Sequence, residues 1–245
     1  MIQRIDLNGE WQFKALNKYG TLPANVQQVT EWMHAMVPGT VHTDLMSNNA
    51  IADPFVRMNE LDVQWVDSQQ WVYQKEFVVD QQLLSERNVE LVAEGLDTFA
   101  RISINGKNVA ETSNMFVEHR FSVKRFLKEG KNVIAILFDS PVMRSKKLET
   151  QHGRLKVALE PHRVYVRKAQ YSFGWDWGPR LTTSGVWRNI SLEGYSDPVL
   201  REPEIKTISV SKRQAVVEWS IAIAGTSNPP FQVCVTISGG GKDVT

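Results

Sequence analysis

The sequence predicts an all-β protein built as a sandwich or jelly roll. Three observations favour this fold class. Residues 71–79 and 133–138 are rich in aromatic and β-branched side chains, which suit a pleated, half-buried surface. Asn105-Gly106 separates two further strand-like runs, as in a tight hairpin. Helix signals are few and short.

The strands follow one another through the first 195 residues. Asn-Gly supplies the two positive-φ positions that a type I′ turn requires, so the runs on either side of it form a hairpin. The continuous apolar run at 133–138 is typical of a central strand, and the alternation at 187–193 predicts a closing strand. The predicted strands are residues 71–79, 89–92, 99–104, 107–111, 133–138 and 187–193.

Two short helices are expected. Thr40 can cap a helix of one or two turns over residues 41–46. Ser140-Pro141 can begin a second one, because serine caps helices and proline fits the first helical position.

A domain boundary is expected at residues 195–198, Tyr-Ser-Asp-Pro. Beyond it, residues 204–210, 215–223 and 231–237 read as three strands, the last two separated by residues 225–230. Three strands are too few for an immunoglobulin-like sandwich, which uses about seven. We therefore expect the chain to end inside a domain.

Composition excludes several classes of protein. The formal charge is +1, so the molecule has no overall field that would capture nucleic acid or an anionic membrane. Cys234 is the single cysteine and cannot form an internal disulfide. No apolar run approaches the roughly 20 residues of a membrane span, and no signal peptide is visible at the start. A soluble protein of a reducing compartment is the default, hence a cytoplasmic location.

Motifs for cofactors and metals are missing from the sequence. The five histidines are scattered, and none has a second ligand at a tight metal spacing. There is no GxGxxG, no GxxxxGK[ST] and no GxSxG. We expect no metal and no cofactor.

The segment 141–170 is basic, and two interpretations of it stay open. It contains Arg144, Lys146, Lys147, Arg154, Lys156, Arg163, Arg167 and Lys168 against two glutamates. Such a cluster could bind nucleic acid by displacing counterions, but Tyr165 alone offers an aromatic platform among these charges. A solvated face, or a surface that docks an acidic domain, is the simpler interpretation.

The most informative segment is residues 173–179, Phe-Gly-Trp-Asp-Trp-Gly-Pro. Its glycines and proline predict an irregular loop. An indole can stack on the C–H face of a sugar, and a carboxylate can accept strong hydrogen bonds from its hydroxyls. Trp175, Asp176 and Trp177 could therefore bind a carbohydrate. The alternative is that both tryptophans fill the core while Asp176 caps a turn.

Three carboxylates close in sequence, Asp53, Glu60 and Asp62, invite comparison with glycosidases, which use two carboxyl groups about 5–9.5 Å apart. Closeness in sequence does not create that geometry. Surface solvation or loop capping is the expected role of each.

Many segments together resemble the amino-terminal part of the β-mannosidases of glycoside hydrolase family 2. They occur in the family's order between residues 7 and 193, and the RKAQY and GWDWGP segments favour the mannosidase branch. The matching segments are residues 7–13, 37–45, 53–55, 59–60, 65–66, 71–73, 94–98, 105–106, 114–116, 167–171, 174–179 and 185–188.

The resemblance implies a galactose-binding-like jelly-roll β-sandwich over residues 1–196 and the start of an immunoglobulin-like β-sandwich over residues 197–245. In the family, a (β/α)₈ barrel follows and carries both catalytic glutamates. This chain shows no alternating βα pattern that could build that barrel. Asn59-Glu60 copies the dipeptide of the family's acid/base residue but lies in the first domain, so the role is not transferred.

The family hydrolyses terminal, non-reducing β-D-mannosyl residues with retention of configuration and without a cofactor. By resemblance, Asp176 accepts hydrogen bonds from mannose hydroxyls, Trp175 walls the sugar pocket, and Trp177 is the next candidate. The chain contains no catalytic residue on this view. We expect it to be inert alone and to need the downstream barrel as its partner.

Two other functions stay open. A free-standing carbohydrate-binding module would use the same sandwich, and measurable mannose affinity would favour it. An interaction domain could use the basic segment, and salt-dependent oligonucleotide binding would favour that interpretation.

As an alternative to the cytoplasmic location, a lysosomal location would apply to an animal protein with a trimmed leader.

Overall fold

The computed structural model describes residues 2–16, 19, 22–225, 232–239 and 242–244. The chain divides into two compact units, one formed by residues 3–194 and the other by residues 195–245 with the first two residues. Each unit is described by itself below.

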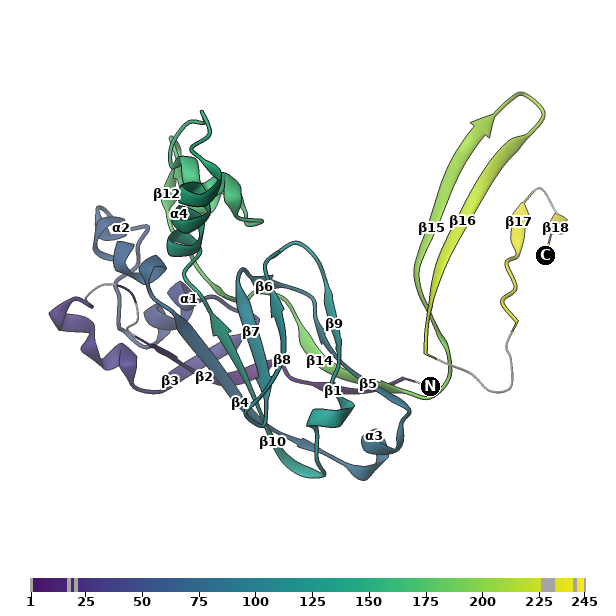
Figure 1. Ribbon diagram of the computed structural model, residues 1–245, viewed down its shortest axis with the longest axis horizontal. Helices are drawn as coiled ribbons and strands as arrows, with labels where there is room; N and C mark the ends of the chain where they lie inside the picture. Colours follow the sequence, from purple (N-terminus) through teal and green to yellow (C-terminus); the bar gives the residue numbers. More distant parts are fainter. Residues whose placement is uncertain (1, 17–18, 20–21, 226–231, 240–241, 245) are drawn as a thin grey trace. The chain divides into compact units, whose positions relative to one another are not determined.

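A four-stranded and a six-stranded sheet form the sandwich of the larger unit (Figure 1). The described residues of this unit also include two two-stranded sheets, β11 (Phe173–Trp175) with β12 (Gly178–Arg180) and β13 (Gly185–Val186) with β6 (Leu96–Asp97). The four-stranded sheet has the strand order β1 (Gln3–Asp6), β14 (Ile190–Tyr195), β5 (Asn88–Ala93), β9 (His119–Ser122). The six-stranded sheet has the order β3 (Met33–Val37), β2 (Gly9–Ala15), β4 (Trp71–Val79), β10 (Gly130–Phe138), β7 (Ala100–Ile104), β8 (Lys107–Thr112). The predicted all-β sandwich is confirmed.

β10 is a central strand, as its apolar run predicted. It pairs with β4 along its whole length and with β7 along its second half. Its inward side chains meet a cluster of aromatic rings from β2 and β4. The ring centroids of Phe13 and Tyr73 are 5.4 Å apart, and those of Tyr73 and Phe138 are 5.7 Å apart in an edge-on arrangement. Burying each such ring stabilises the fold by roughly 1.5–3 kcal/mol, so this cluster anchors the core.

The hairpin of β7 and β8 turns at the predicted dipeptide. Asn105 has a φ of 51° and Gly106 a φ of 75°, both in the left-handed region that the turn needs. The Asn105 side chain also donates to the carbonyl of Phe126 at 2.9 Å. This contact ties the turn to η3 (Lys124–Phe126).

Both predicted helices are present. α1 (Val41–Ser47) is capped by Thr40, whose hydroxyl accepts from the Thr43 N–H. α4 (Pro141–His152) begins after the cap Ser140 and is longer than the short helix expected. Its Lys, Glu and Leu residues favour helix, and the helix ends only at Gly153, where φ is 92°.

Short elements connect the strands of the larger unit. They are η1 (Ala24–Thr30), α2 (Asn59–Asp62), η2 (Gln64–Ser68), α3 (Gln81–Ser85), β6 (Leu96–Asp97), η4 (Pro161–Tyr165), η5 (Gln170–Ser172), β11 (Phe173–Trp175), β12 (Gly178–Arg180) and β13 (Gly185–Val186). Figure 1 shows α1, α4 and β12 near one end of the sandwich and α3 near the other.

Two antiparallel strand pairs lie in the described part of the smaller unit. β15 (Val199–Val210) pairs with β16 (Ala215–Ala224), which confirms two predicted strands, and β17 (Ile237–Gly239) pairs with β18 (Lys242–Val244). Of the third predicted strand, 231–237, Phe231 lies outside the described residues, as does most of the separating segment 225–230. Residues 232–236 are irregular, so that part of the prediction is wrong. The immunoglobulin-like assignment of 197–245 stays a prediction.

Candidate functional site

Residues 173–180 form a β-hairpin, so the prediction of an irregular loop is wrong. β11 pairs with β12, and Asp176 and Trp177 make the turn between them. Gly174 adopts a φ of 88°, a conformation that side chains rarely accept. Pro179 is accommodated because a two-stranded sheet leaves one side of each strand unpaired.

The three predicted site residues lie together at the turn and face solvent. Trp175 is 46% exposed and Trp177 is 78% exposed. Asp176 is exposed, and among the described residues its carboxylate has no hydrogen-bond or ion-pair partner. The alternative in which both indoles fill the core is therefore not what the structure shows.

A cavity of about 360 Å³ lies beside the hairpin. Trp175, Trp177, Tyr171 and Trp187 contribute aromatic surface to its lining, while Asp176 does not line it. Asp97 is the acidic side chain in the lining, and it is only 3% exposed. The cavity therefore offers mainly ring faces, and the free carboxylate lies outside it at the turn.

Asp97 is paired with a lysine behind the cavity. Lys168 Nζ donates to Asp97 Oδ2 and, at 2.9 Å, to the Thr183 carbonyl, and the Lys168 side chain is fully buried. Burial lowers the pKa of Lys168, and the facing Asp97 carboxylate opposes that shift. Lys168 precedes the hairpin and Thr183 follows it, so the hydrogen bond between them closes the base of the hairpin. Removing the charge of Lys168 or of Asp97 would leave the other charge buried and unpaired.

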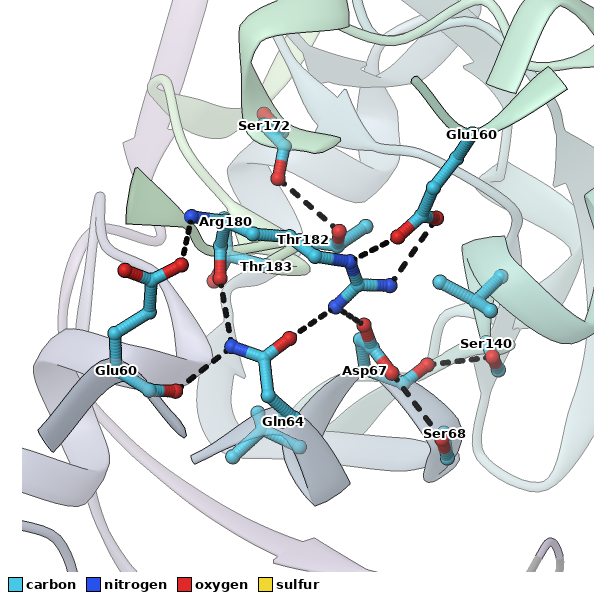
Figure 2. Close-up of polar contacts among 12 residues, drawn as sticks. Glu60, Gln64, Asp67, Ser68, Ser140, Glu160, Ser172, Arg180, Thr182 and Thr183 are labelled. Carbon is cyan, nitrogen blue, oxygen red and sulfur yellow. Dashed lines mark hydrogen bonds and ion pairs between the residues drawn. The ribbon is translucent and has the colours of Figure 1, made fainter. Parts of the chain in front are cut away.

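A second polar cluster surrounds Arg180, at the end of β12. Its guanidinium faces Gln64, Asp67 and Glu160 (Figure 2). Burial raises the pKa of Asp67, while the adjacent guanidinium of Arg180 acts against that shift. The hairpin is thus bound to the body of the domain from two sides.

The other acidic residues singled out in the sequence have structural roles or face solvent. Asp53 Oδ1 accepts from the Phe55 N–H at 2.9 Å, and Glu60 Oε1 accepts from the Arg180 N–H at 2.6 Å. Asp62 is exposed on α2. The expected roles of loop capping and solvation therefore hold for Asp53 and Asp62, but not for Glu60, whose carboxylate anchors the main chain of Arg180, 120 positions away.

The basic segment 141–170 is only partly solvated. Arg163 and Lys168 are buried, the first against Gln170 Oε1 at 3.0 Å and the second against Asp97. The remaining six basic residues are exposed: Arg144, Lys146, Lys147, Arg154, Lys156 and Arg167. The simpler interpretation of a solvated face is wrong for the two buried cations, because each is drawn inward by a specific acceptor.

Within the described residues, no group of three or more His, Cys, Asp or Glu side chains could hold a metal ion. No helix among them is long and apolar enough to cross a bilayer.

The family described as glycosyl hydrolase 2 galactose-binding domain-like matches residues 11–188. This chain belongs to that family, as the sequence resemblance indicated.

Relatives and solved structures agree with this membership. Beta-mannosidase B of Aspergillus fumigatus is 34% identical over all of this chain, and that of Thermothelomyces thermophilus is 37% identical over 90% of it. The chain spans about 28% of the length of these curated relatives. The β-D-mannosidase of Dictyoglomus thermophilum matches with a TM-score of 0.80 at 40% identity, over 90% of this chain and 26% of that one.

A more distant structure supports the fold alone. The exo-chitosanase of Amycolatopsis orientalis matches with a TM-score of 0.63 at 18% identity, over 92% of this chain and 25% of that one.

Sequence reasoning missed the two clusters that hold the hairpin. In the sequence, Lys168 is only one member of the basic segment 141–170, and Arg180 is only the residue after the segment 174–179. Their partners Asp97 and Asp67 lie 71 and 113 positions away. No local pattern signals such pairs, although Lys168 does belong to one of the segments that carried the resemblance.

Proposed function

We propose that this chain is the amino-terminal, non-catalytic region of a retaining β-mannosidase, which hydrolyses terminal non-reducing β-D-mannosyl residues. The hairpin β11–β12 supplies one wall of the pocket for the terminal sugar. Membership of the family and the name shared by the curated relatives support the reaction. The chain supplies the wall and the scaffold, and both catalytic carboxylates come from the barrel that follows in the family.

One observation carries the assignment of the wall. An exposed carboxylate without a partner among the described residues, Asp176, stands between two exposed indoles at the end of a hairpin. Exposing two tryptophans to water is unfavourable unless a ligand or another surface covers them. A sugar fits both features, because its C–H face covers a ring while its hydroxyls donate to the carboxylate.

The roles follow from these chemistries. Asp176 accepts hydrogen bonds from hydroxyls of the terminal mannose, and Trp175 stacks on or walls that ring. Trp177 is the outer member of the wall. Hydrogen bonds to sugar hydroxyls that strengthen in the transition state lower the barrier, so this wall contributes to rate as well as to binding.

Asp176→Ala in the full-length enzyme tests the proposal. We expect kcat/KM for nitrophenyl β-mannoside to fall about 10- to 100-fold, because a hydrogen bond to a charged acceptor contributes about 1.5–3 kcal/mol. Asp62→Ala, which removes an exposed carboxylate from α2, is the matched control and should leave kcat/KM unchanged. An unchanged kcat/KM in Asp176→Ala would reject the assignment. Mannose affinity of the chain alone, together with that result, would favour the carbohydrate-binding module instead.

A further inference from the structure

The main chain of Arg180 is fixed by two residues far away in the sequence. The Arg180 N–H donates to Glu60 Oε1 at 2.6 Å, and the Arg180 carbonyl accepts from Gln64 Nε2 at 2.9 Å. Gln64 Nε2 also donates to the Glu60 carbonyl at 2.7 Å. Figure 2 shows how α2 and η2 thereby hold the return strand of the hairpin.

The Arg180 side chain joins further segments through its planar set of donors. Nε and Nη2 face the two carboxylate oxygens of Glu160, while Nη1 donates to Gln64 Oε1 and Asp67 Oδ2. The side chain of Arg180 is 23% exposed and that of Asp67 only 5%. A lysine ammonium cannot reproduce this fork of contacts, because it is a single point charge.

The acceptors are themselves held in place. Glu160 Oε2 lies 3.0 Å from His162 Nε2, and His162 Nδ1 lies 2.8 Å from Ser145 Oγ on α4. The Asp67 carbonyl accepts from the hydroxyl of Ser140, the cap of α4. Arg180 is therefore bound to a surface that α4, η2 and η4 form together.

The turn of the hairpin has much weaker support. Asp176 has no partner among the described residues, and Trp177 is 78% exposed. Trp175 has a cation–π contact with Arg163, whose guanidinium carbon lies 5.8 Å from the centroid of the Trp175 ring. The position of the turn must consequently be set at the base of the hairpin.

We infer that Arg180 is a positioning residue, which fixes the base of β11–β12 so that Asp176 and Trp175 project at one place. This inference deepens the proposed function and rests on it. Arg180 does not line the cavity beside the hairpin. A displacement of about 1 Å at a reacting site can reduce a rate up to about 100-fold, so a loosened base should be visible in kinetics.

The test uses the full-length enzyme with Arg180→Met, Arg180→Lys, Asp176→Ala and the double variant Arg180→Met/Asp176→Ala. Two quantities are measured: kcat/KM for nitrophenyl β-mannoside and hydrogen exchange of the amides of residues 173–180. Arg101→Met is the matched control, because Arg101 forms an exposed ion pair with Glu111 at 2.8 Å on the β7–β8 hairpin.

We expect Arg180→Met to lower kcat/KM about tenfold and to speed exchange in residues 173–180, while amides of β4 and β10 keep their protection. Arg180→Lys should recover part of the loss. In the Asp176→Ala background the same Arg180→Met change should cost less than about threefold, because its effect acts through Asp176. Arg101→Met should match the parent enzyme.

Two results would overturn the inference: unchanged exchange of residues 173–180 in Arg180→Met, or full multiplication of the two single effects in the double variant. If Asp176→Ala leaves kcat/KM unchanged, the proposed function fails, and hydrogen exchange of residues 173–180 alone then decides the role of Arg180.

If Arg180→Met does not fold, Glu160→Gln replaces it. We then expect a loss of about threefold in kcat/KM and faster exchange of residues 173–180. No loss and no faster exchange in Glu160→Gln would then reject the inference.

Discussion

Two ionisable residues on α1 are buried with opposite consequences for stability. Burial, with a smaller contribution from the charge of Lys168, lowers the pKa of His42 to about 4. Burial also raises the pKa of Asp44 to about 6, although hydrogen bonds from the Tyr73 hydroxyl and the Met36 N–H oppose that shift. Acid therefore destabilises the fold through His42 and stabilises it through Asp44.

The His42 contribution can be isolated with His42→Leu. The unfolded state takes up a proton near pH 6.5, while the folded state does so only near pH 4, so stability is lost as the pH falls between these values. At about 1.4 kcal/mol per pKa unit, the loss reaches about 3 kcal/mol. As the pH falls from 7 to 4, the parent should lose free energy of unfolding relative to His42→Leu, because the variant lacks this titrating group. Urea denaturation at each pH measures the difference.

Taking the difference removes the opposing effect of Asp44, which both proteins share. His152→Leu, a change of an exposed histidine at the end of α4, is the control and should follow the parent curve. A pH-independent difference for His42→Leu would show that His42 is not held neutral by burial.

At the scale of elements, the β11–β12 hairpin depends on one of its two glycines. Gly174 has a φ of 88°, and a Cβ there would lie 3.1 Å from the Arg180 Cβ. Gly178 has neither feature, since a Cβ at that position would have nothing within 4 Å. The two positions thus separate backbone strain from the mere addition of a methyl group.

We expect Gly174→Ala to lower the free energy of unfolding by about 1–2 kcal/mol, because a non-glycine residue is strained in the left-handed region. Gly178→Ala should change it by less than about 0.5 kcal/mol. Both are measured by chemical denaturation of the 245-residue chain. Equal effects of the two substitutions would contradict this role of Gly174.

The sequence predicted those elements whose local pattern is strong. Residues 71–79 and 133–138 carry long β-branched and aromatic runs, and Asn105-Gly106 has one favoured turn, so β4, β10 and the β7–β8 hairpin were expected. β1 and β3 were not, because Gln-Arg-Ile-Asp and Met-His-Ala-Met-Val have little β preference. Their strand state is set by pairing with β14 and β2.

The residue types of the candidate site were predictable from the sequence, but the contacts that hold the hairpin in place were not. Indoles flanking a carboxylate suggest sugar binding from chemistry alone, and the structure leaves all three side chains exposed. The anchoring of the hairpin through Arg180 depends on Glu60 and Asp67, which lie more than 100 positions away. Contacts between such distant segments follow from the tertiary fold, which is why local patterns could not reveal them.

At the scale of the molecule, the proposed function makes the larger unit a support for a small exposed hairpin. Its four- and six-stranded sheets share a core of aromatic and aliphatic side chains, and the Lys168 and Arg180 clusters bind the hairpin to the body of the domain. Rigid elements hold a binding group more accurately than free loops do. A sandwich with no catalytic residue can therefore still contribute to the rate of a reaction at its surface.

The most direct measurement is a crystal structure of the full-length enzyme with a mannose-configured inhibitor in the terminal-sugar pocket. The proposed function predicts an Asp176 carboxylate oxygen within about 3 Å of a sugar hydroxyl, with the Trp175 ring against the sugar. A sugar bound in the pocket with Asp176 beyond hydrogen-bond distance, and with neither Trp175 nor Trp177 in contact, would contradict it.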